Sequence, residues 1–231
     1  TVPETIEEEN YFFKLSNYQD FLLDLIESDK LKITPQTRKN EITSFIKQGL
    51  DDFSISRSVS RARGWGVPVP GDKNQVMYVW FDALVTYLTT LGFPSGKNYK
   101  EYWGDNQKKT HIIGKGINRF HTIYWPAMLK SAGIDLPSDV FVHGYITVDG
   151  QKISKTLGNT VDPIELVKKY GSDVVRYYFL REIPSWGDGD FSESRLKELY
   201  NGELANGLGN LVARVARLAS DINLKLPVKK S

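Results

Sequence analysis

Apolar residues recur at helical spacing in the first fifty positions, after a short aromatic run that is typical of a strand. Within residues 10–28 the apolar positions are Tyr18, Phe21, Leu22, Leu25 and Ile26, which share one helical face. Ser16 or Asn17 is a suitable N-cap for this helix. A second helix is predicted to begin at Pro35 and to end at Gly49. Both helices are expected to pack on a core.

Two later segments combine a predicted strand with a helix. Residues 76–81 have the continuous apolar character of a buried, parallel strand, and helical spacing begins at Ala83. Residues 110–117 form another short apolar run that ends in glycines, and a helix through Leu129 is predicted to follow. Strands that alternate with helices indicate an α/β fold, in which ligands bind at the carboxyl ends of the strands.

The most distinctive stretch of the chain combines a strand with a lysine loop. An apolar, β-branched run over residues 142–148 leads into an Asp149-Gly150 turn, and Lys152 and Lys155 follow three positions apart. Flexible lysine ammonium groups suit phosphate oxygens whose charge changes during a reaction. The spacing alone is more typical of a solvated surface, so the neighbouring motifs must decide between the two interpretations.

Helices are predicted for the remainder of the chain. Asp162 is an N-cap, Pro163 occupies the first turn and Gly171 ends that helix, and a further helix covers residues 173–182. From Ser192 onward a long amphipathic helix is expected. Its apolar stripe consists of Leu204, Leu208, Leu211, Val212, Val215, Leu218, Ala219 and Ile222.

Composition narrows the class of protein only modestly. The chain has 231 residues, 40% of them hydrophobic and 25% charged, and a net charge of +2, which describes a globular protein of one large or two small domains. It has no cysteine, and His111, His121 and His143 lack metal-ligand spacing. No apolar run approaches the ~20 residues needed to cross a bilayer. A cytoplasmic location without a membrane or DNA partner is therefore expected.

The lysine loop resembles a known family motif. Lys152-Ile153-Ser154-Lys155-Thr156 is similar to the KMSKS loop of class I aminoacyl-tRNA synthetases, with Ile153 in place of Met and Thr156 in place of the last Ser. The flanking Phe-Val-His-Gly-Tyr and Leu-Gly-Asn-Thr-Val-Asp-Pro resemble methionyl-tRNA synthetases. Three further segments resemble the same family. They are Leu-x-Asp-x-Ser-Ile-Ser-Arg ending at Arg57, Val-Trp-Phe-Asp-Ala-Leu at 79–84, and the Phe-His-x-x-x-Trp helix around His121.

The resemblance covers essentially the whole chain in one consistent order. It implies a Rossmann-like parallel sheet, the second half of a class I catalytic domain, followed by a helical region. The implied divisions are the end of a connective insertion at 1–56, the half-domain at 57–150, the lysine loop and stem-contact fold at 151–198, and the first anticodon-bundle helix at 199–231.

The resemblance also implies an activity and its residues. The activity is ATP-dependent activation of methionine to methionyl-adenylate, with Mg²⁺ on the phosphates, and transfer to the methionine tRNA. Lys152 and Lys155 are the implied catalytic groups. The implied ATP-binding residues are Lys152, Ile153, Ser154, Lys155, Gly114, His143 and Ile146. The implied methionine-binding residues are Trp80, Ala83, Leu84, Tyr87, Ile117, His121 and Trp125.

Two departures from the family pattern stand out. Gly116 occupies the position where the family commonly has Asp, a carboxylate expected near the ribose and paired with the arginine that matches Arg57. The HIGH-type motif of the family's first half is absent, as is its cysteine zinc knuckle. His111-Ile-Ile-Gly114 has the wrong residue order to replace the HIGH motif. We therefore expect the first half to be missing or on another chain, and the 231 residues alone to form adenylate poorly.

Three alternatives remain open at this point. Another class I synthetase, for leucine, isoleucine, valine or cysteine, would share the lysine loop. A non-catalytic module for tRNA binding or subunit docking, derived from a synthetase, would explain the missing half and Gly116. A globular α/β domain of unrelated function would share only the fold class.

Overall fold

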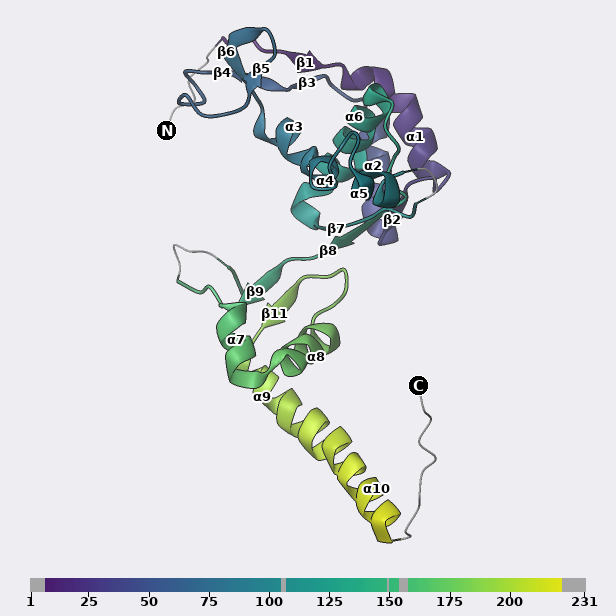
Figure 1. Cartoon of the computed structure of the whole chain (residues 1–231), viewed down its shortest axis with the longest axis vertical. Helices are drawn as coiled ribbons and strands as arrows, with labels where there is room; N and C mark the ends of the chain where they lie inside the picture. The colour runs from purple at the N-terminus through teal and green to yellow at the C-terminus, as the bar shows by residue number, and fades with distance from the viewer. Residues whose placement is uncertain (1–6, 105–106, 149, 154–157, 222–231) are drawn as a thin grey trace. The chain divides into compact units, whose positions relative to one another are not determined.

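The computed structural model describes residues 7–104, 107–148, 150–153 and 158–221. Their contacts divide the chain into two compact units, one up to His143 and one from Gly144 onward. Figure 1 shows the elements of each unit. The four-part division that the family resemblance implies stays a prediction.

A three-stranded parallel sheet lies in the first unit. Its strands, in spatial order, are β2 (Lys32–Thr34), β8 (Asp139–His143) and β7 (Thr110–Gly114). Alternate residues of β8, Val140 and Val142, are buried and pack in one core with apolar residues of two helices. These helices are α1 (Gln19–Glu27) and α2 (Gln36–Lys47). The parallel sheet with packed helices confirms the predicted α/β fold.

The start of α1 differs from the prediction. Ser16 and Asn17 lie in a 3₁₀ turn, η1 (Leu15–Tyr18), and Tyr18 precedes the helix. The amide and hydroxyl of Ser16 both donate to Asp52. Ser16 therefore links two segments by hydrogen bonds instead of capping a helix. Pro35 and Gly49 flank α2 as predicted, and Gly49 has a φ of +105°.

The strand expected at residues 76–81 is corrected in both extent and direction. β6 (Asp72–Met77) runs antiparallel to its two neighbours, β4 (Ser56–Ser58) and β5 (Pro68–Val69), and α3 (Val79–Leu84) begins two residues after it. The Tyr78 carbonyl already accepts the amides of Phe81 and Asp82, which starts the helix. A short apolar run does not distinguish a buried strand from a buried helical turn. A further strand pair joins β1 (Phe12–Phe13) to β3 (Phe53–Ser54).

Short helical segments surround a second core cluster in the same unit. They are α4 (Thr86–Thr89), α5 (Lys97–Tyr102), η2 (Lys115–Ile117), the π-helical turn η3 (Phe120–Tyr124) and α6 (Trp125–Ala132). Leu84, Leu88, Trp103, Trp125, Met128 and Leu129 are buried together. The single helix predicted after residue 117 is thus interrupted by the π turn.

The run at residues 142–148 forms two strands instead of one. β8 ends at His143, and β9 (Ile146–Val148) belongs to a separate sheet of the second unit, with β10 (Gln151–Lys152) and β11 (Gly189–Phe191) as neighbours. Gly144 packs directly on the backbone of Gly187, and the Tyr145 amide donates to Asp188, 2.8 Å away. These contacts interrupt the strand. Val148 pairs with Gln151 across the predicted turn, of which Asp149 lies outside the described residues.

The helices of the second unit follow the predicted signals. In α7 (Pro163–Tyr170) the Asp162 side chain accepts the Ile164 amide as N-cap, and α8 (Ser172–Glu182) follows. Ser192 caps α9 (Glu193–Leu199), which continues through the π-helical η4 (Tyr200–Gly209) into α10 (Asn210–Asp221), as Figure 1 shows. None of the described helices is both long and apolar enough to span a membrane.

Candidate functional site

Tyr87, His121 and Trp125 come together although they lie on α4, η3 and α6. The Tyr87 hydroxyl lies 2.8 Å from His121 Nε2, and the Tyr87 ring centroid lies 6.1 Å from that of Trp125. His121 Nδ1 lies 3.0 Å from the carbonyl oxygen of Ile117. Leu84 is buried in the same cluster as Trp125. The structure thus joins five of the seven predicted methionine-binding residues.

The other two predicted methionine-binding residues lie on α3. The Trp80 ring stacks on Phe120, with centroids 4.3 Å apart, so it adjoins the π turn that carries His121. Ala83 is exposed. Phe120, which the residue pattern did not single out, therefore adds an aromatic ring beside the predicted methionine-binding residues.

His121 is placed by its hydrogen bonds in one tautomer. A carbonyl oxygen only accepts, so His121 Nδ1 carries the proton that bonds to Ile117, and Nε2 accepts the Tyr87 hydroxyl. Burial lowers the pKa of His121, and the bond to the Ile117 carbonyl acts in the opposite direction. Burial also raises the pKa of the Tyr87 hydroxyl. Both shifts favour the neutral forms of these two side chains.

A further histidine adjoins this cluster from the parallel sheet. His111 on β7 accepts a hydrogen bond of 3.2 Å from Trp125 Nε1, and its ring centroid lies 4.4 Å from that of Tyr87. His111 had no role among the residues predicted from the sequence. The one signal available was its position in a buried strand, where a polar residue is uncommon.

Gly114 and His143 meet at the carboxyl ends of neighbouring parallel strands. They form the last pair in the register of β7 with β8, and a Cβ on Gly114 would lie 3.6 Å from His143 Cε1. Both were predicted to bind ATP. Their place at this edge of a parallel sheet is the usual one for ligands in an open α/β fold.

The remaining predicted ATP-binding residues belong to the second unit. Ile146 begins β9, and Lys152 on β10 pairs with its neighbour Thr147, so both lie on one hairpin. Lys152 and Ile153 are exposed, and the Lys152 carbonyl accepts from Asn159 Nδ2 at 3.1 Å. Ser154 and Lys155 lie outside the described residues.

Arg57 has partners other than a carboxylate at position 116. Its guanidinium donates to Ser54 Oγ at 2.6 Å and to the Ser56 carbonyl at 2.7 Å, and it lies 4.6 Å from the centroid of the Tyr78 ring. Gly116 lies in η2. Nη1 of Arg57 thus donates to two neutral oxygens, and the guanidinium also contacts an aromatic ring.

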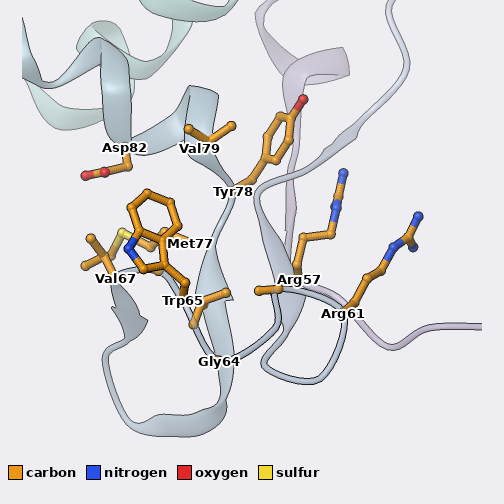
Figure 2. A pocket seen from close by; sticks show the side chains of 12 residues that line it. Arg57, Arg61, Gly64, Trp65, Val67, Met77, Tyr78, Val79 and Asp82 are labelled. Carbon is orange, nitrogen blue, oxygen red and sulfur yellow. The ribbon is translucent and has the colours of Figure 1, made fainter.

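A pocket of about 640 Å³ adjoins Arg57 and was missed by the sequence analysis. Val79 and Asp82, one turn apart on α3, line it together with Trp65 and Met77. Figure 2 shows Trp65, Val67 and Met77 gathered on one side, with the guanidinium ends of Arg57 and Arg61 on the other. The available signal was an apolar Trp-Gly-Val stretch inside an arginine-rich loop. The lining of this pocket is mainly apolar, with charged side chains only at its margins.

No metal-binding site is evident among the described side chains. Within residues 7–104, 107–148, 150–153 and 158–221, no group of three or more His, Asp or Glu side chains is arranged to hold a metal ion.

Comparisons with known proteins agree with one another. The family described as "tRNA synthetases class I (M)" matches residues 1–216. The methionine–tRNA ligase of Brucella suis biovar 1 (strain 1330) is 49% identical over 229 residues, which are 98% of this chain and 43% of that protein. The chloroplastic/mitochondrial methionine–tRNA ligase of Arabidopsis thaliana is 49% identical over 216 residues, 91% of this chain and 34% of that protein.

A solved structure shows the same likeness in three dimensions. Mycobacterium tuberculosis methionyl-tRNA synthetase bound by methionyl-adenylate superposes with a TM-score of 0.84 at 46% identity, over 93% of this chain and 41% of that one. The chain therefore spans less than half the length of the relatives it matches. It belongs to the family of class I tRNA synthetases (M).

Proposed function

We propose that this chain forms part of the catalytic region of a methionine–tRNA ligase, which activates methionine with ATP and transfers it to the methionine tRNA. The observation that best supports this proposal is the uncharged cluster of Tyr87, His121 and Trp125, which lie on three separate elements. The names of the relatives and the methionyl-adenylate in the similar structure support the same substrate.

The cluster has the properties that a methionine side chain requires. A thioether is a weak hydrogen-bond acceptor, so it is held mainly by packing and by contact with aromatic rings. Trp80, Tyr87, His121 and Trp125 supply such rings, and Ala83, Leu84 and Ile117 supply apolar surface. A charged side chain would lose hydration in this cluster without gaining a counter-ion, and is therefore excluded.

The proposed reaction needs no nucleophile from the protein. A carboxylate oxygen of methionine attacks the α-phosphorus of ATP, and the bond to the leaving pyrophosphate breaks as methionyl-adenylate forms. ATP enters as its Mg²⁺ complex, and the ion is held by the phosphates. Lys152 and Lys155 balance the charge of the leaving pyrophosphate, and Ser154 and Ile153 of the same loop belong to the ATP-binding site in this proposal.

The nucleoside end of ATP is assigned to the sheet edge. Gly114 permits close approach of the ribose, because it has no side chain, and His143 lies beside it on the next strand. Ile146, on β9 of the second unit, is also assigned to ATP binding in this proposal. In the second step the tRNA acceptor hydroxyl attacks the methionyl carbonyl and AMP leaves. A cytoplasmic location stays a prediction.

Methionine-dependent ATP–pyrophosphate exchange tests the proposal. The 231-residue chain is assayed alone and after addition of the amino-terminal half of a methionine–tRNA ligase, with Lys152→Met as the variant and Lys108→Met as a surface control. We expect exchange only in the complemented sample and its loss in Lys152→Met. Exchange that is independent of methionine, or unaffected by Lys152→Met, would contradict the assignment.

The surroundings of Arg57 and Gly116 favour a second candidate, a non-catalytic tRNA-binding module. Gly116 lacks the carboxylate that the family commonly has there, and Arg57 is already bonded to Ser54 and Ser56. Such a module would bind tRNA with an affinity that falls as salt rises, but would show no exchange after complementation. Filter binding of tRNA at two salt concentrations, beside the exchange assay, separates the two candidates.

A further inference from the structure

His111 is a buried polar residue that the proposed reaction does not use. It is the second residue of β7 and is 7% exposed. Its imidazole faces three aromatic side chains from other elements, with ring centroids 4.4 Å from Tyr87, 5.6 Å from His121 and 6.1 Å from Trp103. It therefore lies against Tyr87 and His121, two of the proposed methionine-binding residues.

The hydrogen bond to Trp125 determines the state of His111. An indole Nε1–H only donates, so the His111 Nε2 at 3.2 Å must accept and cannot carry a proton. The proton of a neutral imidazole then lies on Nδ1. If His111 were charged, Nε2–H would point at the indole N–H, donor against donor. Burial and the neighbouring His121 lower the pKa of His111 to about 4, in agreement with the neutral form.

Trp125 has a particular need for this acceptor. Its side chain is almost fully buried, and a buried indole N–H without a partner is costly. Trp103, the other indole beside His111, donates to the Asp135 carbonyl at 3.0 Å. The His111 nitrogen is thus available to Trp125, and it orients the indole plane relative to Tyr87 and His121.

We infer that His111 is a positioning residue for methionine recognition, which fixes the Trp125 indole through Nε2 and supports the Tyr87 ring against His121. This inference rests on the proposed function. If this position needed only a side chain that fills space, Phe or Leu would suit it better, because removing an imidazole from water costs free energy. The imidazole supplies an acceptor that both satisfies and orients the Trp125 indole, which neither Phe nor Leu could do.

Two variants separate positioning from packing. His111→Gln places an amide oxygen near the position of Nε2, whereas His111→Phe keeps a ring of similar volume but no acceptor. Methionine affinity of the chain is measured by calorimetry, alone and with the complementing amino-terminal half. We expect His111→Phe to weaken methionine binding about tenfold, equivalent to 1.4 kcal/mol. His111→Gln should restore most of the affinity.

Nuclear magnetic resonance of the unmodified chain supplies a second readout. At pH 7 we expect His111 to carry its proton on Nδ1, and the Trp125 indole N–H to exchange with solvent far more slowly than that of Trp65, which is 79% exposed. A proton on His111 Nε2, or equally rapid exchange of the two indoles, would overturn the inference even if the variants failed to fold.

The outcomes also distinguish this inference from the proposed function. Failure of the unmodified, complemented chain to bind methionine would overturn the function, and with it the inference. Methionine binding that is intact and unchanged in His111→Phe, or reduced equally in His111→Gln and His111→Phe, would overturn the inference alone.

Discussion

The hydroxyl of Tyr87 donates a 2.8 Å hydrogen bond to Nε2 of His121, and this bond ties helix α4 to the π-helical turn η3. The direction of the bond follows from the other side of the ring, where Nδ1 donates to the Ile117 carbonyl. Two residues 34 positions apart thereby become one unit of the proposed methionine pocket.

Tyr87→Phe removes this bond and leaves a buried acceptor without a partner, since His121 is 2% exposed. We expect the free energy of unfolding to fall by about 1–2 kcal/mol and methionine affinity to weaken. Urea unfolding and calorimetry measure the two effects. Tyr102→Phe, at an exposed tyrosine, is the control. Equal stability of the two variants would contradict the importance of the bond.

The low pKa of His111 makes stability depend on pH. The ordinary value is 6.5 and the folded value about 4, so between these limits the unfolded chain binds more protons than the folded one. The free energy of unfolding should therefore fall as pH decreases from 6.5 to 4, by up to roughly 3 kcal/mol. The direction of the His121 shift adds to this trend.

Urea unfolding at pH 7, 5.5 and 4.5 checks this pH dependence. The titratable groups that face His111 are Tyr87 and His121. The Lys109 ammonium lies 5.7 Å from the centroid of the Trp103 ring, which also contacts His111. His111→Gln removes one titrating group and should flatten the curve. An unchanged slope in His111→Gln would show that other groups cause the loss of stability.

Gly144 is a position where the second unit tolerates no side chain. A Cβ there would overlap the carbonyl group of Gly187 and lie 2.6 Å from the Asp188 amide nitrogen. Gly144→Ala should therefore lower stability by roughly 3 kcal/mol, as measured by thermal unfolding. Gly202→Ala is the matched control, because its Cβ would meet nothing within 4 Å and a helical alanine is favoured. Similar melting curves for both variants would refute the close contact.

Gly116→Asp restores the carboxylate that the family commonly has. If the proposed function is correct, the variant should raise methionine-dependent exchange of the complemented chain by about tenfold or more, the effect of one charge-assisted hydrogen bond. Gly116→Asn, with similar shape and no charge, is the control. A rise in both variants, or in neither, would indicate that the missing charge does not limit the reaction.

Local signals predicted a large part of the helical structure. The Asp162 cap, Pro163 and Gly171 delimit α7 as expected, and Ser192 caps α9. Such signals succeed because a cap involves residues only two or three positions apart. The motif order likewise predicted the family, since a sequence motif is itself a local pattern.

Predictions failed where distant segments meet. The run at 76–81 was expected as a parallel strand, but the Tyr78 amide bonds to the Ile55 carbonyl, and the strand ends at Met77 before α3 begins. Likewise, the strand at 142–148 is interrupted because Gly144 packs on Gly187, more than forty residues later. Apolar character alone carries no information on such partners.

The sequence by itself determined the α/β class, the cap of α7 and the family, because each is encoded in local spacing or in a motif. Only the tertiary structure decided that His111 accepts from Trp125 and that Tyr87 donates to His121. Those bonds join residues 14 and 34 positions apart, and the packing of a strand, two helices and a π turn sets their geometry.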